Sequence, residues 1–188
     1  MEQSDLIPFV RENLDILFVW LNPARGSSRN RHYFSVNQAF WNQLYDSGLI
    51  LSPVDKSNAD EIIFGGTKNN FHGWSYGITD LVTAIAESDS RQIKPGREDC
   101  RNLACLIQRL SPKAAILLHG KVLKNFLPFA GHPVPRSNSG RLGKLVAGCP
   151  TEFFNIAFPH GNAIPSSDKV VQYREVKHYL ETLEQTVR

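Results

Sequence analysis

Apolar runs of strand length alternate with helical patterns along this 188-residue chain. The predominantly apolar runs cover residues 16–21, 78–82, 114–118 and 153–158. They recur with helical period over residues 37–48, 97–110, 121–127 and 167–183, with Pro128 ending the third of these. Strands that alternate with helices form a mainly parallel sheet covered on both faces. The pattern therefore predicts one α/β domain over residues 1–188, a three-layer α/β/α sandwich around a four-stranded, mainly parallel sheet. Long loops are expected at residues 52–67 and 128–148.

The first strand ends in a polar residue, Asn22, which is followed by Pro23. A loop rich in Gly, Ser and Arg comes next, and then a helix for which Asn37 is the N-cap candidate. Open α/β sheets bind ligands beyond the carboxyl ends of their strands, so Asn22 is the first candidate for a functional residue. The alternative is an Asn-Pro turn in which the amide bonds only to nearby backbone.

The same stretch carries a family resemblance, and further segments repeat it in order along most of the chain. Asn22-Pro23, Phe34 and Asn37-x-x-Phe40-Trp41 resemble the first motif of the uracil-DNA glycosylase superfamily. The most similar branch is the mismatch-specific uracil/thymine-DNA glycosylases, whose motif reads G-x-N-P-G and then N-x-F-W. Three other segments, residues 76–82, 114–121 and 153–180, are similar to later parts of the same family.

The resemblance implies a DNA glycosylase that flips out uracil, or a related damaged or mispaired base, and excises it by hydrolysis. Asn22 would hold the water that attacks C1′ of the sugar, a task that an amide performs without charge. Phe34 would be the platform on which the flipped base stacks, although packing in the core is the simpler alternative. Ala24 and Asn37 would line the base site, while Phe40 and Trp41 belong to the helix core. Ala24 and Trp20 stand where the family often has Gly.

The second motif departs from the family. Mismatch-specific enzymes have N-P-S-G and other branches have H-P-S, whereas this chain has Phe158-Pro159-His160-Gly161-Asn162. His160 could donate a hydrogen bond to O2 of the departing base and so act in catalysis. Alternatively it contacts phosphate or is simply solvated. Gly161 and Asn162 would contact DNA, with Asn162 at the position of the residue that fills the gap left by the flipped base.

The basic residues are unevenly distributed. The net charge is only +3, but residues 100–151 contain eight Lys or Arg and no Asp or Glu. Such a segment suits the phosphate backbone of DNA, although a solvated protein face is the alternative reading. The predicted phosphate contacts are Arg25, Lys121, Arg136 and Arg141. His119 is a further candidate contact, and Asp80 an alternative, less favoured, catalytic base.

Other classes of protein lack support in the sequence. Three cysteines with no C-x-x-C spacing do not suggest a zinc site, an iron–sulfur cluster or a disulfide framework, and Cys100 is expected in the core. The chain has no apolar stretch of membrane length, no G-x-G-x-x-G and no P-loop. We therefore expect a cytoplasmic monomer, nucleoid-associated in a bacterium, with DNA as its partner and no cofactor or metal. The alternative is a superfamily member that binds DNA but has lost efficient catalysis.

Overall fold

A central sheet of five strands organises the chain. The computed structural model describes residues 2–186. The strand order is β3-β2-β5-β7-β6, in which the first four strands are parallel to one another and β6 is antiparallel to β7. The strands are β2 (Ile16–Trp20), β3 (Tyr76–Asp80), β5 (Ala114–Leu117), β6 (Gly140–Gly143) and β7 (Glu152–Asn155). A separate two-stranded pair joins β1 (Glu2–Gln3) to β4 (Ile85–Ala86).

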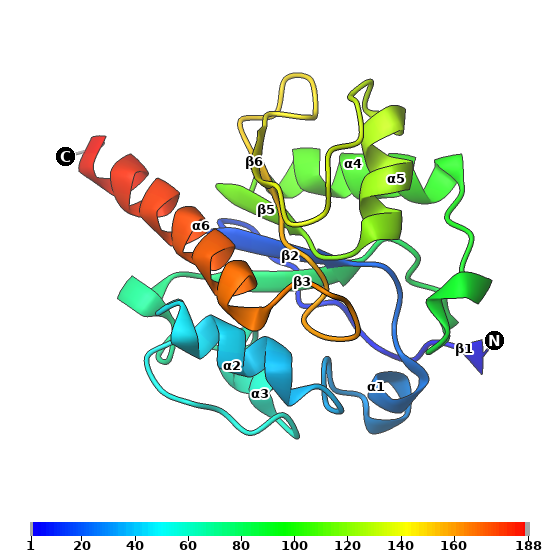
Figure 1. Cartoon of the computed structure of the whole chain (residues 1–188), viewed down its shortest axis with the longest axis horizontal. Coiled ribbons are helices and arrows are strands. Elements are labelled where there is room, and N and C mark those ends of the chain that lie inside the picture. Colours follow the sequence, from blue (N-terminus) through cyan, green and yellow to red (C-terminus); the bar gives the residue numbers. More distant parts are fainter. Residues whose placement is uncertain (1, 187–188) are drawn as a thin grey trace.

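Helices cover both faces of the sheet, so the molecule has three layers (Figure 1). Alternate residues of β2 point to opposite faces. Ile16 and Phe18 belong to one core, with residues of α2 and α6, whereas Leu17 and Val19 belong to a second core, with residues of α4 and α5. The helices are α1 (Arg25–Asn30), α2 (Gln38–Asp46), α3 (Ala59–Ile63), α4 (Arg97–Leu110), α5 (Gly120–Phe129) and α6 (Ser166–Thr186). This arrangement confirms the predicted α/β/α sandwich.

The sheet has one strand more than the four that the sequence predicts. The extra strand, β6, contains two glycines and one arginine in four residues, so it lacks the apolar run that marks the other strands. It lies at the edge of the sheet and is held by backbone pairing to β7, with a bulge between Arg141 and Gly143. A short helix, α3, likewise lies inside the segment 52–67, which was predicted as a loop.

The helix boundaries follow the sequence pattern closely. Helix α4 has the predicted bounds, and Asn37 is the N-cap residue of α2, although its side chain makes no capping bond. The prediction that α5 stops before Pro128 was wrong, because the helix continues through Pro128 to Phe129. Proline has no backbone N–H, so Pro128 costs the helix one hydrogen bond. The helix tolerates this loss because Pro128 lies in its last turn.

Membrane-spanning helices and metal-binding clusters are both absent from the described residues. Within residues 2–186, no helix is long and apolar enough to cross a membrane, and no group of three His, Cys, Asp or Glu could hold a metal ion. Cys100 is buried in the core, as predicted.

Candidate active site

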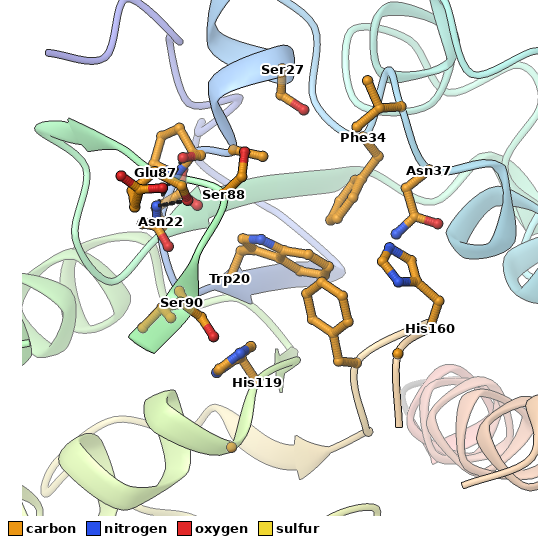
Figure 2. A pocket seen from close by; sticks show the side chains of 18 of the residues that line it. Trp20, Asn22, Ser27, Phe34, Asn37, Glu87, Ser88, Ser90, His119 and His160 are labelled. Carbon is orange, nitrogen blue, oxygen red and sulfur yellow. Dashed lines mark hydrogen bonds between the residues drawn. The ribbon is translucent and has the colours of Figure 1, made fainter. Parts of the chain in front are cut away.

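A cavity of about 680 Å³ opens at the carboxyl ends of the parallel strands. Loops that follow β2, β3, β5 and β7 all contribute to its lining. The lining includes every residue that the sequence assigns to catalysis or to the base, together with two of the predicted DNA contacts: Asn22, Ala24, Phe34, Asn37, His160, Gly161 and Asn162. Figure 2 shows Trp20 between two groups of these residues. We call the group around Asn22, Ser88 and Ser90 the Asn22 side, and the group around Phe34, Asn37 and His160 the His160 side.

Asn22 is buried two residues after the end of β2, and its amide nitrogen is fully engaged. Nδ2 donates to the carbonyl oxygens of Pro23 and Glu87, both at 2.8 Å, and approaches that of Ile85 at 3.4 Å. Because both amide hydrogens are used by backbone carbonyls, the orientation of the planar amide is fixed. The oxygen Oδ1 is therefore the atom that remains for a ligand, and it is an acceptor. This arrangement suits a group that holds and orients a water molecule.

The His160 side is built on aromatic rings. Phe34 is only 5% exposed, and its ring centroid lies 4.1 Å from that of Phe40 and 4.2 Å from that of Trp20. Trp20 in turn lies 4.4 Å from Phe158. Trp20, Phe34 and Phe158 line the cavity and give it an apolar floor. Phe40 and Trp20 pack against Phe34, the side chain predicted to stack on the base, and leave little of it exposed.

Phe34 also has an unusual backbone conformation, with φ at +54°. This left-handed region costs a residue with a side chain about 1–2 kcal/mol, so surrounding contacts must hold the loop in place. The neighbouring Tyr33 N–H donates to the buried carboxylate of Asp60 at 2.7 Å, and the Asn37 N–H donates to the Phe34 carbonyl at 2.8 Å. The loop between α1 and α2 is thus fixed from α3.

The polar residues of the His160 side differ in exposure. His160 is exposed, and its ring packs edge-on against Phe158 at 5.0 Å. Asn37 is buried, and its Nδ2 has no hydrogen-bond partner among the residues that the structure describes. A buried amide donor without a partner carries a desolvation cost unless a ligand satisfies it. On this side of the cavity, Nδ2 of Asn37 is therefore a donor that a ligand could satisfy by providing an acceptor.

The cavity is also lined by His119, a further candidate DNA contact, and by Asp80, the alternative catalytic base. Nδ1 of His119 accepts from the Lys121 N–H at 3.0 Å, and burial lowers the pKa of the imidazole to about 4. The ring is therefore neutral near pH 7 and carries its proton on Nε2, as a donor. Asp80 accepts from the Tyr33 hydroxyl at 2.8 Å, and burial raises the pKa of its carboxyl to about 7.

The match to a protein-family model covers nearly all of these elements. The model of the uracil DNA glycosylase superfamily matches residues 7–183. The chain belongs to this superfamily. None of the curated proteins compared with the chain matches it. The superfamily that the motifs predict is thus confirmed, while the mismatch-specific branch stays a prediction.

Arg25 and Lys121, two of the four basic residues predicted to contact DNA, have partners inside the protein. Arg25 Nη2 pairs with the Glu87 carboxylate at 2.6 Å, and Lys121 Nζ donates to the carbonyl oxygens of Ser90 and Ile93. Both side chains therefore bind the segment between β4 and α4. None of the four basic residues predicted to contact DNA is among the lining residues of the cavity in the described part of the chain.

The lining also includes three residues that no sequence motif marks: Glu87, Ser88 and Ser90. They follow β4, a strand of only two residues, in a segment without a recognisable motif. Their proximity to Asn22 arises from tertiary structure alone. Trp20 did carry a signal, since a bulky aromatic residue stands at a position where the family often has Gly.

Proposed function

We propose that this superfamily member is a monofunctional DNA glycosylase of the mismatch-specific branch. It would flip uracil, or a related damaged or mispaired base, out of DNA and hydrolyse the glycosidic bond, which initiates base excision repair. One observation carries the proposal: the anchored amide of Asn22, an aromatic floor and the His160 loop line the same cavity at the carboxyl ends of the parallel strands. An extruded base needs such a combination of stacking surface and polar groups.

The residues suggest how the reaction proceeds. The Asn22 oxygen accepts a hydrogen bond from water and directs the water oxygen at C1′. The bond between C1′ and the base breaks, and the base leaves with the electron pair of that bond. The water loses a proton as the new C–O bond forms and the departing base takes up one proton, which gives an abasic sugar and a neutral free base. An amide is a poor general base, so stabilisation of the negative charge on the departing base must provide much of the catalysis.

Three donors around the cavity fit that stabilising role. Nδ2 of Asn37 lacks a partner among the described residues, Nε2 of neutral His119 carries a proton, and His160 offers an exposed imidazole. A carbonyl oxygen of the base would satisfy the Asn37 donor. The exposed Gly161 and Asn162 lie beside His160 at the cavity, where they would meet the strand around the flipped nucleotide. The acid-free segment 100–151 would provide phosphate contacts to DNA.

A DNA-binding module without efficient catalysis is the second candidate. Two features favour it: Phe40 and Trp20 cover Phe34, and the second motif has Phe158 and His160 in place of the family residues. Such a protein would bind DNA and release no base.

Base release from defined substrates distinguishes the two candidates. The purified protein is incubated with single-stranded and duplex oligonucleotides that carry uracil, a T·G mismatch, hypoxanthine or xanthine, and alkali then cleaves any abasic site. A glycosylase yields cleaved product from at least one lesion and none from the undamaged control. Binding of DNA with no cleavage of any substrate supports the binding module and contradicts the glycosylase.

A further inference from the structure

We propose that the ion pair between Arg25 and Glu87 orients the Asn22 amide for reaction, so that both are positioning residues of the cavity. The inference rests on the function proposed above, because it assigns Arg25 and Glu87 to the site in which Asn22 holds the water. It replaces the expectation that Arg25 acts mainly as a phosphate contact.

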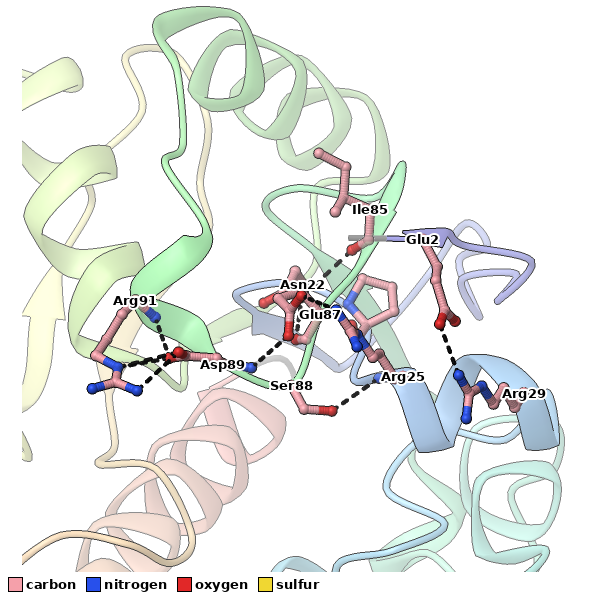
Figure 3. Close-up of polar contacts among 10 residues, drawn as sticks. Glu2, Asn22, Arg25, Arg29, Ile85, Glu87, Ser88, Asp89 and Arg91 are labelled. Carbon is pink, nitrogen blue, oxygen red and sulfur yellow. Dashed lines mark hydrogen bonds and ion pairs between the residues drawn. The ribbon is translucent and has the colours of Figure 1, made fainter.

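The orientation of Asn22 depends on the segment after β4. Figure 3 shows the Asn22 amide against the backbone of Glu87 and Ile85. The carbonyl oxygens of these two residues are two of the three acceptors for Asn22 Nδ2. These residues lie more than 60 positions away in the sequence. If the segment moved, Nδ2 would lose acceptors and the amide could rotate, which would carry Oδ1 away from its present direction. The position of the Glu87 carbonyl therefore determines the direction in which Asn22 Oδ1 faces the water.

The Glu87 carbonyl is in turn fixed by the rest of its residue. Its backbone N–H donates to the Pro23 carbonyl at 3.0 Å, Oε1 accepts from the Asp89 N–H at 2.9 Å, and Oε2 pairs with Arg25 at 2.6 Å. The Glu87 side chain is only 4% exposed. A buried carboxylate requires a cationic or hydrogen-bonding partner, so removal of Arg25 would favour movement of Glu87 toward water. The carbonyl that holds Asn22 would move with it.

Arg25 is well placed to link the two loops. It is the first residue of α1, directly after the Asn22 loop, and its backbone N–H donates to the Ser88 hydroxyl at 3.3 Å. Its guanidinium reaches Glu87 across the junction between the loops. One side chain thus joins the segment that contains Asn22 to the segment that provides its acceptors.

The same helix provides a matched control. Arg29 of α1 pairs with Glu2 at 2.7 Å, but both side chains are exposed, at 67% and 43%, and neither contacts Asn22 (Figure 3). Glu87→Gln and Glu2→Gln each remove the acidic partner of an α1 arginine and change the net charge equally. Arg25→Gln and Arg29→Gln form the corresponding pair of arginine variants.

The test compares these variants by single-turnover base release and by DNA affinity. Loss of the Arg25–Glu87 pair should lower the rate by about tenfold to a hundredfold, because small misplacements of reacting groups are costly, with DNA affinity nearly unchanged after Glu87→Gln. The double variant Arg25→Gln/Glu87→Gln should be no slower than either single variant, since both act through one contact. The two controls should keep the parent rate. Arg25→Lys, which keeps a cation, should fall between the parent and Arg25→Gln.

A second measurement reads the orientation without any reaction. The Nδ2 hydrogens of Asn22, assigned in NMR spectra by their loss in Asn22→Asp, should exchange with solvent faster in Glu87→Gln and Arg25→Gln than in the controls. Unchanged exchange overturns the inference, whether or not the protein has activity. A parent without activity overturns the proposed function alone, and the exchange result still decides the inference. A second outcome also overturns the inference. In it the parent is active, Glu87→Gln releases base as fast as the parent, and Arg25→Gln binds DNA more weakly. Arg25 would then be a phosphate contact.

Discussion

The Asn22 segment on one side of the cavity and the loop after β7 on the other are held in place by different kinds of contact. On the Asn22 side, two of the three carbonyl oxygens around the amide lie more than 60 positions away in the sequence, and the Arg25–Glu87 pair joins the same two segments. On the His160 side, the loop after β7 bonds largely to itself: Asn162 Nδ2 donates to the carbonyl oxygens of Phe158 and His160, at 2.7 and 3.2 Å. The difference separates a site fixed by the fold from a loop with its own local structure.

This difference matches what the proposed function requires of each side. A group that directs water at a reacting carbon gains most when its geometry is fixed before the substrate arrives. A loop that meets DNA around a flipped nucleotide benefits from freedom to adjust. The His160 loop is nevertheless tied to two helices through the Pro159 carbonyl, which accepts from Gln43 of α2 at 3.0 Å and from Lys169 of α6 at 3.2 Å.

The strongest test of the fixed side is Asn22→Ala. Removal of the amide should lower the rate of base release by about a hundredfold to ten-thousandfold, because the water loses the group that orients it. Affinity for DNA should change by less than about threefold, since Asn22 makes no phosphate contact in the proposed mechanism. Single-turnover kinetics and equilibrium binding measure the two quantities. A variant as fast as the parent would falsify the assignment of Asn22.

The boundary between the two sides can be probed through His119, whose ring lies 5.5 Å from that of Phe158. The pKa of this imidazole is about 4 in the folded protein, below its ordinary value of 6.5. Between these values the unfolded chain binds more protons, so the folded protein loses stability as the pH falls from about 6.5 toward 4. His119→Asn keeps an acceptor for the Lys121 N–H and cannot titrate.

We therefore expect stability to fall less between pH 7 and pH 5 in His119→Asn than in the parent, by about 1–2 kcal/mol. Urea unfolding at the two pH values measures this difference. His132→Asn, a change at a histidine outside the cavity lining, provides the control and should follow the parent. Parallel pH profiles of the His119 variant and the parent would show that burial of this ring does not govern the acid response.

One of the two hydrogen bonds to the Pro159 carbonyl can be removed with Gln43→Leu, which leaves the bond from Lys169 in place. Gln43 is 1% exposed and donates to both the Pro159 carbonyl and the Ser166 hydroxyl at 3.0 Å. Loss of these bonds should lower the free energy of unfolding by about 1–2 kcal/mol. Asn42→Ala, at an exposed position of the same helix, should change it by less than about 0.5 kcal/mol.

The comparison of the two sides holds if Gln43→Leu weakens DNA binding and leaves the rate on bound DNA near that of the parent. Such a result places the His160 loop in binding. A large fall in the single-turnover rate with normal affinity would show instead that the His160 loop needs the same rigidity as the Asn22 side.

The sequence predicts this architecture well where local pattern and tertiary role agree. The apolar run before Asn22 forms β2, and the periodicity over residues 97–110 matches α4 at both ends. Strand β6 escapes prediction because backbone pairing at a sheet edge, rather than an apolar run, defines it. Buried elements are therefore easier to predict from the sequence than elements at the edge of the sheet.

The candidate site divides in the same way. Asn22 and Phe34 can be found because they stand at fixed spacing in a motif. Glu87 cannot, since its importance comes from contacts with residues more than 60 positions away. Arg25 and Lys121 show the limit of arguments from charge, because an arginine or lysine in the sequence does not reveal whether a carboxylate or carbonyl inside the protein already occupies it.

The smallest expected effect is a difference in the salt dependence of DNA binding between two arginines of the segment 100–151, one exposed and one paired with a carboxylate. Arg136 is exposed and precedes Ser137, a lining residue of the cavity, whereas Arg141 pairs with Glu152 at 2.7 Å and lies over the Tyr179 ring at 4.9 Å. Arg136→Gln should reduce the slope of log affinity against log salt concentration by about one unit, as expected for one lost phosphate contact. Arg141→Gln should change this slope less, and should lower stability because the buried carboxylate of Glu152 loses its partner. Salt titrations of DNA binding, with urea unfolding of the same proteins, measure both quantities. Equal slopes for the two variants would mean that DNA draws Arg141 away from Glu152, and that the antiparallel edge of the sheet belongs to the DNA-binding surface as fully as the mouth of the cavity.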